Sequence, residues 1–352
     1  MKKDTEMHWV GMDVSKATFD VALACSGQHF PSTPLRTLPW RSFARTEAGV
    51  AQFLAWLDEQ LPEEELPQVR GVMEATGNYS IELTAWLVQQ HPGLAPAIEN
   101  PARTKAFIDS LGQRNRTDGM AARGLAFYGA ERHPAPYEPL TPECLELRTL
   151  SRCRDTLVNE RTALKNRAHE RCSSSLVRTI RKRRLKQLDR DIAKLEQEMK
   201  RIVDETPTLK SDFGLLVSIP GVGPITAMVV LAEVGDLRRF KRARQLSAHV
   251  GVSPRVWESG TSVHHKTRLC KQGNPRVRQA LFLSAMAAVN TKSPNCLNET
   301  YRRLCLADKP AKAALGAVMR KQLVLMRALL ISGKPYDPLW KTQRPNQRAL
   351  AT

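Results

Sequence analysis

The segment from Leu147 to Val203 constrains the fold of this chain most strongly, because it contains neither glycine nor proline. Within it, apolar residues recur at intervals of 3, 4, 3, 4 and 3, at Leu185, Leu188, Ile192, Leu195, Met199 and Ile202. This is the heptad pattern of helices that pack side by side, and Leu150, Leu157 and Leu164 repeat every seven residues upstream. The run 173–175, three serines, separates the two stripes. The segment predicts either a helical hairpin or a dimeric coiled coil, and both alternatives stay open.

The chain before this segment alternates between strand and helix patterns. Residues 8–25 contain two β-prone apolar runs around a polar turn, which predicts a hairpin with Asp13 in its first strand. Another apolar run ends on Glu74, and apolar periodicity then predicts helices over 80–90, 102–110 and 117–130. Prolines between 134 and 142 end this pattern. We expect an α/β domain over residues 1–142, a helical connector over 143–206, and a mainly α-helical domain over 207–352.

Charge is distributed unevenly along the chain. Residues 1–140 contain 13 Lys and Arg against 17 Asp and Glu, a net charge of −4, so of the total of +19 a net of +23 belongs to residues 141–352. A uniformly solvated basic surface would account for solubility but not for this split. A basic surface attracts polyanions, so we expect nucleic-acid binding in the rear half and chemistry in the front half.

Two classes of protein are excluded by composition. Apolar runs such as 323–331 are too short, or too often interrupted by charge, to cross a bilayer. The N-terminus has no apolar segment behind its basic residues, so we expect no secretion signal. The seven cysteines are odd in number and form no C-x-x-C pair, which argues against a disulfide framework or a zinc site. We therefore expect a cytoplasmic protein with reduced thiols.

Three acids stand at the ends of predicted elements or inside the first strand: Asp13, Glu74 and Asp118. Carboxylate oxygens are the ligands that Mg²⁺ prefers, with water and phosphate completing its coordination. Scattered acids are common, however, and Asp118 is equally suited to the first turn of a helix and Glu74 to a solvated turn. Composition alone therefore gives only a weak indication of a metal site.

Candidate nucleic-acid contacts occur at three places. The first is a basic run without an intervening acid, Arg178, Arg181, Lys182, Arg183 and Arg184, for which a solvated helix face is the alternative. The second is a helix-hairpin-helix-like segment over 215–227, where Gly221 and Gly223 would either expose backbone N–H groups to a phosphate or allow close helix packing. The third is a polar loop expected over 252–262, followed by Arg268 and Lys271. Positive charge there would help Ser259 to attack a phosphodiester, although an ordinary loop serine is the simpler interpretation.

The sequence also carries a series of motifs in a fixed order. They are GMDVSK at 11–16, MEATG at 73–77, RTDGMAA at 116–122, IPGVGPITA at 219–227, SPRVWESG at 253–260, KQGNPRVR at 271–278 and GKPYDP at 333–338. With these motifs the chain resembles, nearly end to end, the DEDD transposases of insertion sequences, the bridge-RNA-guided serine recombinases. The combination is far more specific than any single motif.

The resemblance implies an N-terminal RNase H-like (RuvC-like) domain, a coiled-coil connector and a C-terminal transposase domain. It implies that Asp13, Glu74 and Asp118 are the first three DEDD acids and bind Mg²⁺, and that Ser259 is the nucleophile that forms a phosphoserine link to a cleaved strand. It further implies double-stranded DNA partners at the element ends and target, a structured non-coding bridge RNA that pairs with both, and homodimers that assemble into a tetramer. On this basis we expect a bacterial cytoplasmic protein that joins the nucleoid when it binds DNA.

Two positions depart from the family pattern. The fourth acid normally follows the third by three residues, one helical turn along the same face, and here that position is Ala121. Loss of a ligand should weaken Mg²⁺ binding and impair catalysis. A natural variant, a degenerate copy or a deliberate replacement would each leave this pattern, and the intact remainder of the motif favours the last. The second departure is Cys270, where relatives have serine, so Thr261 and Ser262 remain alternative nucleophiles.

Two other functions compete with the recombinase. A RuvC-like junction resolvase would use water as its nucleophile and leave hydrolysed ends without a protein–DNA adduct. A non-catalytic nucleic-acid-binding protein would show salt-dependent binding without turnover, an alternative that Ala121 strengthens.

Overall fold

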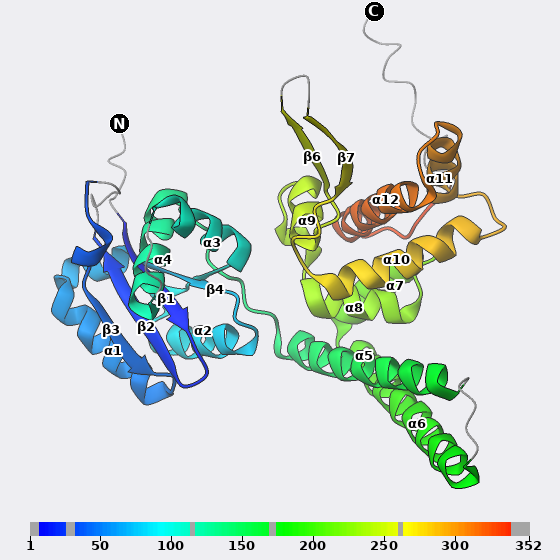
Figure 1. Ribbon diagram of the computed structural model, residues 1–352, viewed down its shortest axis with the longest axis horizontal. Helices are drawn as coiled ribbons and strands as arrows, with labels where there is room; N and C mark the ends of the chain where they lie inside the picture. Colours follow the sequence, from blue (N-terminus) through cyan, green and yellow to red (C-terminus); the bar gives the residue numbers. More distant parts are fainter. Residues whose placement is uncertain (1–6, 26–31, 113–116, 169–173, 260–262, 339–352) are drawn as a thin grey trace, which may run out of the picture. The chain divides into compact units, whose positions relative to one another are not determined.

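The computed structural model describes residues 7–25, 32–112, 117–168, 174–259 and 263–338. The chain divides into two compact units, unit 1 over Met1–Pro139 and unit 2 over Leu140–Thr352 (Figure 1). In the described ranges, no helix is both long and apolar enough to span a membrane.

Unit 1 is built on a five-stranded mixed sheet. Its strands are β1 (His8–Val14), β2 (Thr18–Ala24), β3 (Trp40–Ala44), β4 (Val69–Glu74) and β5 (Ala97–Glu99), in the spatial order β3-β2-β1-β4-β5. The first three strands pair antiparallel, whereas β4 pairs parallel with both β1 and β5. The hairpin predicted over 8–25 and the strand predicted to end on Glu74 are both confirmed.

Helices cover both faces of this sheet (Figure 1). The helices are α1 (Glu47–Gln60), α2 (Asn78–Gln90), α3 (Pro101–Ser110) and α4 (Asp118–Arg132). Successive strand side chains point to opposite faces, so Val10 and Met12 enter the core with Phe53 of α1 and Leu83 of α2. Trp9 points the other way and packs with Leu125 of α4. The predicted α/β architecture of the front part is therefore observed.

Helix α4 lies directly against β1 because Gly11 has no side chain. A Cβ on Gly11 would lie 2.1 Å from the carbonyl oxygen of Ala122 and 2.2 Å from the amide nitrogen of Ala126, both in α4. Any larger residue at this position would push the helix away from the sheet. Gly11 faces the same side of β1 as Asp13, so this close approach keeps α4 beside the face that carries Asp13.

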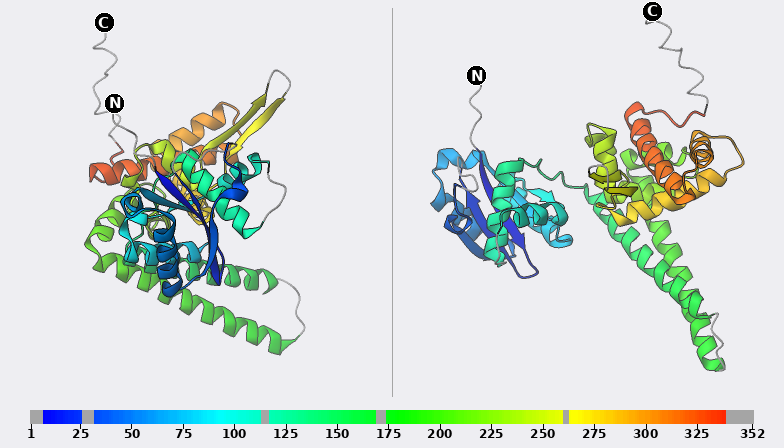
Figure 2. Two further views of the ribbon diagram at one scale, coloured as in Figure 1. Left: turned by 90° about the vertical axis from the view of Figure 1, so that its left-hand side faces the viewer. Right: turned by 45° about the horizontal axis from the view of Figure 1, so that its top comes forward.

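Unit 2 begins with two long helices, α5 (Pro142–Ala168) and α6 (Ser175–Glu205), which lie side by side (Figure 2). Three ion pairs join them, Arg154–Glu196 at 2.9 Å, Arg161–Asp189 at 3.1 Å and Glu160–Arg184 at 3.0 Å. Residue numbers fall along one helix as they rise along the other, so the pair is antiparallel. Of the two predicted alternatives, the helical hairpin within one chain is observed; residue 173 of the serine run lies outside the described residues.

The remaining helices of unit 2 form a bundle in which α5, α7 and α10 pack directly against α8. They are α7 (Pro207–Val217), α8 (Pro224–Val234), α9 (Ala243–Val250), α10 (Pro275–Asn290), α11 (Cys296–Leu306) and α12 (Ala311–Ser332). Residues of α8, among them Ala227, Val230 and Leu231, are buried in the largest apolar cluster of the described residues. Apolar residues on nearly all sides of α8 are expected of a helix surrounded by others.

A two-stranded antiparallel hairpin, β6 (Pro254–Ser259) and β7 (Val263–Leu269), projects from these helices (Figure 1). The prediction of a polar loop over 252–262 was therefore wrong for residues 254–259. Polar residues in this run obscured its β-forming Val256 and Trp257. The partner strand, which supplies the backbone hydrogen bonds, is not evident from the local sequence.

Candidate active site

The three predicted acids of unit 1 come together on the α4 face of the sheet. Asp13 and Glu74 lie on the neighbouring parallel strands β1 and β4, each one residue beyond the paired Met12 and Met73. Asp118 is the first residue of α4, the helix that lies on β1. Both strand acids are half-buried, whereas Asp118 is exposed.

These carboxylates act on one another through their charges. The pKa of Asp13 is raised to about 6, first by burial and then by the negative charges of Glu74, Asp118 and Asp20. The backbone N–H of Val14 opposes this shift by a hydrogen bond to the Asp13 carboxylate. The repulsion shows that Asp13 lies within electrostatic reach of the other predicted acids, and it is a repulsion that a bound cation would relieve.

Glu74 is held by a neighbour from another element. The hydroxyl of Thr104, on α3, donates a hydrogen bond of 2.7 Å to Glu74 Oε1. Thr104 is fully buried, so its rotamer is fixed by packing. This contact restrains the carboxylate at the end of β4 and makes Thr104 a positioning residue for the acid cluster.

Asp20 is an acid of this cluster that sequence reasoning missed. It lies on β2 directly opposite Asp13 in the antiparallel register and is only 7% exposed. Burial raises its pKa, a hydrogen bond with Ser42 of β3 lowers it, and the charge of Asp118 raises it. A signal was present, because pairing two strands around the polar turn at 15–17 places the two aspartates across from each other.

Ala121 lies one turn after Asp118 on α4 and brings no ligand atom to the cluster. Among the residues that the structure describes, no three His, Cys, Asp or Glu side chains are arranged to hold a metal ion. The acids therefore interact electrostatically, but their carboxylates do not surround a common metal position. Chemically, however, a half-buried set made only of carboxylate oxygens fits Mg²⁺.

The predicted nucleophile lies in unit 2. Ser259 is the last residue of β6, and its backbone pairs with Val263 of β7. Its side chain and the alternatives Thr261 and Ser262 lie outside what the structure describes. At the base of the hairpin, Arg268 is exposed and lies opposite Arg255, and the exposed Lys271 follows in a left-handed conformation with φ of 58°.

Two of the five cations in the basic run on α6 stabilise the helical hairpin. Arg181 donates a hydrogen bond of 2.9 Å to the carbonyl of Arg167 at the end of α5. Arg184 pairs with Glu160. Lys182 and Arg183 are exposed between them. The run therefore combines a structural pair with two cations that face solvent.

The turn between α7 and α8 gives its two glycines different surroundings. Gly221 packs against α10, where a Cβ would lie 2.4 Å from the carbonyl oxygen of Ser284, and the Ser284 hydroxyl donates to the Gly221 carbonyl at 2.9 Å. Close packing thus accounts for Gly221 without a ligand. A Cβ on Gly223, which precedes α8, would meet open space.

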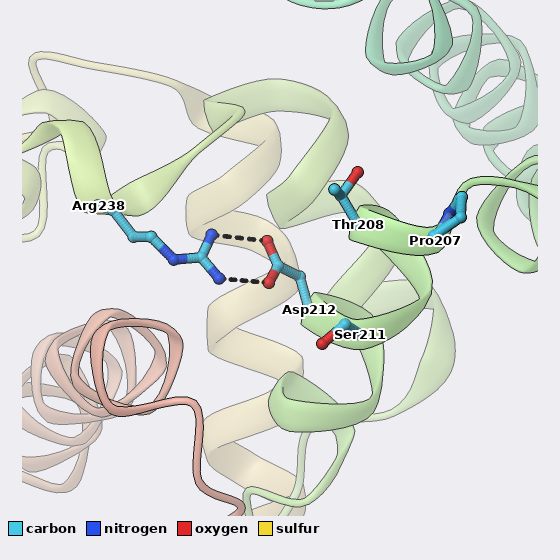
Figure 3. Close-up of a pocket in the computed structure, with 5 residues that line it drawn as sticks. All are labelled: Pro207, Thr208, Ser211, Asp212 and Arg238. Carbon is cyan, nitrogen blue, oxygen red and sulfur yellow. Dashed lines mark hydrogen bonds and ion pairs between the residues drawn. The ribbon is translucent and has the colours of Figure 1, made fainter.

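Unit 2 also carries a hollow between α7 and the short 3₁₀ helix Leu237–Arg239 (Figure 3). It is lined by Pro207, Thr208, Ser211, Asp212 and Arg238. The guanidinium of Arg238 donates to both carboxylate oxygens of Asp212 and, at 3.1 Å, to Asp236. These charges satisfy one another, and the hollow contains none of the predicted site residues.

Comparison with known proteins identifies the class. A DEDD transposase model of IS110 elements matches residues 10–172, and a model described as "Transposase IS116/IS110/IS902 family" matches residues 214–302. The chain is 28% identical to the pilin gene-inverting protein of Moraxella bovis over 94% of this chain and 97% of that protein. It is 27% identical to the transposase for insertion sequence element IS1111A of Coxiella burnetii, over 69% of this chain and 73% of that protein.

These matches identify the chain as a DNA transposase. The chain belongs to the IS116/IS110/IS902 family of transposases, in agreement with the resemblance found in its motifs.

Proposed function

We propose that this transposase is an RNA-guided recombinase of an insertion sequence, which cuts and rejoins donor and target DNA through a phosphoserine intermediate. The observation that carries the proposal is that Asp13, Glu74 and Asp118 lie on one face of the unit 1 sheet, where burial and then the charges of Glu74 and Asp118 raise the pKa of Asp13. Carboxylates that share one face of the sheet in a transposase are suited to a cation that binds phosphate.

Domain roles follow from this proposal. Residues 1–142 form the RNase H-like (RuvC-like) catalytic domain, which the strand order β3-β2-β1-β4-β5 supports. Residues 143–206 form a coiled-coil connector, and residues 207–352 form the transposase domain that carries the serine. The net charge of +23 over residues 141–352 supports the assignment of nucleic-acid binding to these two parts.

Asp13, Glu74 and Asp118 would hold Mg²⁺ through their carboxylate oxygens. A bound Mg²⁺ supplies positive charge that polarises the scissile phosphate. Thr104 restrains Glu74 so that its second oxygen can turn toward the ion. Asp20, opposite Asp13, adds negative charge that favours a cation at this face.

Ser259 would supply the nucleophile. Its hydroxyl oxygen attacks the phosphorus of a DNA phosphodiester, the P–O bond to one deoxyribose breaks, and the serine proton passes to the released sugar oxygen, which becomes a hydroxyl. The new ester has as many P–O bonds as the old one, so the strand can be rejoined by the reverse reaction without another energy source. Thr261 and Ser262 are the alternative nucleophiles.

Cations of unit 2 would hold the nucleic acids by their phosphates. Lys182 and Arg183 on α6, and Arg268 and Lys271 beside the β6–β7 hairpin, are exposed and carry no sequence information themselves. Gly223 and the N-terminal backbone of α8 would add a further phosphate-binding site, as the helix-hairpin-helix-like form of 215–227 suggests. Base pairing by a bridge RNA would select the DNA. The resemblance alone leads us to propose a homodimer that assembles into a tetramer on two DNAs, because the heptad stripe of α6 is largely buried within one chain.

A second candidate, a non-catalytic nucleic-acid-binding protein, is favoured by Ala121. A chain that lacks the fourth carboxylate has a weaker metal site, and its activity is expected to be impaired. Assays should therefore include the parent chain and the variant Ala121→Asp side by side.

A strand-exchange assay tests the proposal. Element ends, target DNA and the non-coding RNA that flanks the gene are incubated with the Ala121→Asp chain and Mg²⁺. We expect recombinant DNA, and its loss when the RNA is omitted or when Ser259→Ala is introduced. Recombination without the RNA contradicts guidance, and cleavage that yields only hydrolysed ends supports a resolvase instead.

A further inference from the structure

Trp40, the first residue of β3, is a large aromatic side chain that is 46% exposed. Single exposed apolar side chains are common, so exposure alone says little. The ring of Trp40, however, is fixed in place. A Cβ on Gly119 of α4 would come within 2.9 Å of its Cδ2 and Cε3 atoms, and the Arg123 guanidinium carbon lies 5.7 Å from its centroid. Arg123 is itself anchored, because its Nε donates to the carbonyl of Leu38 at 3.0 Å.

Both contacts come from one helix. Gly119 and Arg123 are four residues apart and therefore lie on the same side of α4. Helix α4 thus packs against the ring, while Trp40 as a whole stays 46% exposed. An aromatic surface that is exposed but already ordered loses little conformational entropy when a flat ligand stacks on it.

The exposed ring lies beside the acid cluster. Gly119, which touches Trp40, directly follows Asp118 in α4. On β3, Trp40 shares its face with Ser42, two residues away, and Ser42 hydrogen-bonds to Asp20. A DNA strand whose phosphate reaches the acids therefore passes close to the indole.

Charge gives a reason for a stacking contact here. Unit 1 carries a net charge of −4, because residues 1–140 contain 13 Lys and Arg against 17 Asp and Glu, and its acids repel phosphates. Phosphate contacts alone would hold a strand poorly on this unit. Base stacking on an aromatic ring is sequence-tolerant and needs no net positive charge.

We infer that Trp40 is a stacking platform for an unpaired base of the DNA strand that enters the acid site. The inference rests on the proposed function, which places that strand at Asp13, Glu74 and Asp118. The base has to be unpaired, because bases within a duplex already stack on their neighbours and present only their edges. Trp40 would thereby act as a positioning residue that fixes the strand next to the scissile phosphate.

Fluorescence of 2-aminopurine tests this inference on the full parent chain. The probe is placed at successive unpaired positions of a forked DNA that carries an element end, and stacking quenches its emission. We expect quenching at one or two positions, its loss in Trp40→Ala and Trp40→Leu, and its retention in Trp40→Phe. Affinity for the forked DNA should fall about tenfold in Trp40→Ala, as expected for one stacked base. Leu306→Ala, at an apolar residue of α11 that is 87% exposed, is the matched control and should change neither value.

Several results would overturn the inference. One is equal quenching in the parent chain and Trp40→Ala, and another is an equal loss of affinity for forked and fully paired DNA. Quenching that depends on Trp40 only with an RNA probe would assign the ring to RNA instead. The readout is equilibrium binding, so it is independent of catalysis: absence of strand exchange by Ala121→Asp counts against the proposed function, whereas quenching unaffected by Trp40→Ala counts against the platform.

Discussion

Replacing Asp13 by asparagine should stabilise the protein while it removes catalysis. The pKa of Asp13 rises from 3.8 to about 6 on folding, mainly through burial and then through the charges of Glu74, Asp118 and Asp20. A shift of roughly two units corresponds to about 3 kcal/mol for a fully buried group, and solvent screening of a half-buried one reduces this to about 1–2 kcal/mol. The free energy of unfolding of Asp13→Asn should exceed that of the parent chain by this amount near neutral pH.

The effect has a defined pH dependence. Between about pH 4 and 6 the folded state binds more protons than the unfolded state, so the stability of the parent chain falls as the pH rises through this window. Above about pH 6 the full penalty is present, and below about pH 4 it disappears. The advantage of Asp13→Asn should therefore be largest at about pH 8 and vanish at about pH 4.

Urea unfolding in EDTA, followed by tryptophan fluorescence at several pH values, measures this difference. Asp58→Asn, at an exposed acid of α1 outside the cluster, is the matched control and should leave stability unchanged. Excess Mg²⁺ should raise the unfolding midpoint of the parent chain more than that of Asp13→Asn. A variant no more stable than the parent at about pH 8, or one equally more stable at all pH values, would refute the electrostatic reasoning.

Three other variants test separate parts of the structure. Ala121→Asp should gain Mg²⁺-dependent DNA cleavage, and no gain would mean that this position is not a metal ligand. In that background, Thr104→Val should lower cleavage about tenfold because Glu74 loses its hydrogen bond, whereas Thr104→Ser keeps the hydroxyl and should keep the activity. The two variants should have the same melting temperature. Equal cleavage activity of Thr104→Val and Thr104→Ser would rule out the positioning role. Arg152 donates to both oxygens of the buried Glu233, at 2.8 and 2.9 Å, so Arg152→Ala should lower the free energy of unfolding by about 2–4 kcal/mol in urea titrations. A change below about 0.5 kcal/mol would show that the pair is not needed.

The elements of unit 1 were predictable because its strands and helices follow simple apolar periods. The two strands around the turn at 15–17 and the strand ending on Glu74 are observed as predicted. The acids were named from the sequence because Asp13 lies in the first predicted strand, Glu74 ends a later one and Asp118 stands at the start of a predicted helix. Their proximity on one sheet face is a tertiary property, which the parallel pairing of β1 with β4 creates.

Other features depend on contacts between distant segments and escaped prediction. Asp20 joins the acid cluster only through the register of β2 against β1. Trp40 lies beside the cluster because its ring packs against Gly119 of α4. Strand β6 was expected to be part of a loop, since its polar residues weaken the local signal and its pairing partner β7 is a separate segment. Gly221 proved to be a packing residue, a role set by α10 more than 50 residues downstream.

The central claim is that a serine of unit 2 becomes covalently linked to DNA in a reaction that needs the carboxylates of unit 1. The most direct test incubates the Ala121→Asp chain with Mg²⁺, the flanking RNA and labelled element ends, separates adducts on a denaturing gel, and maps the modified residue by mass spectrometry. We predict an adduct on Ser259 that is absent from Asp13→Asn and Ser259→Ala and present in Thr261→Ala. Cleaved DNA without any protein adduct, or an adduct on a different residue, would contradict this account.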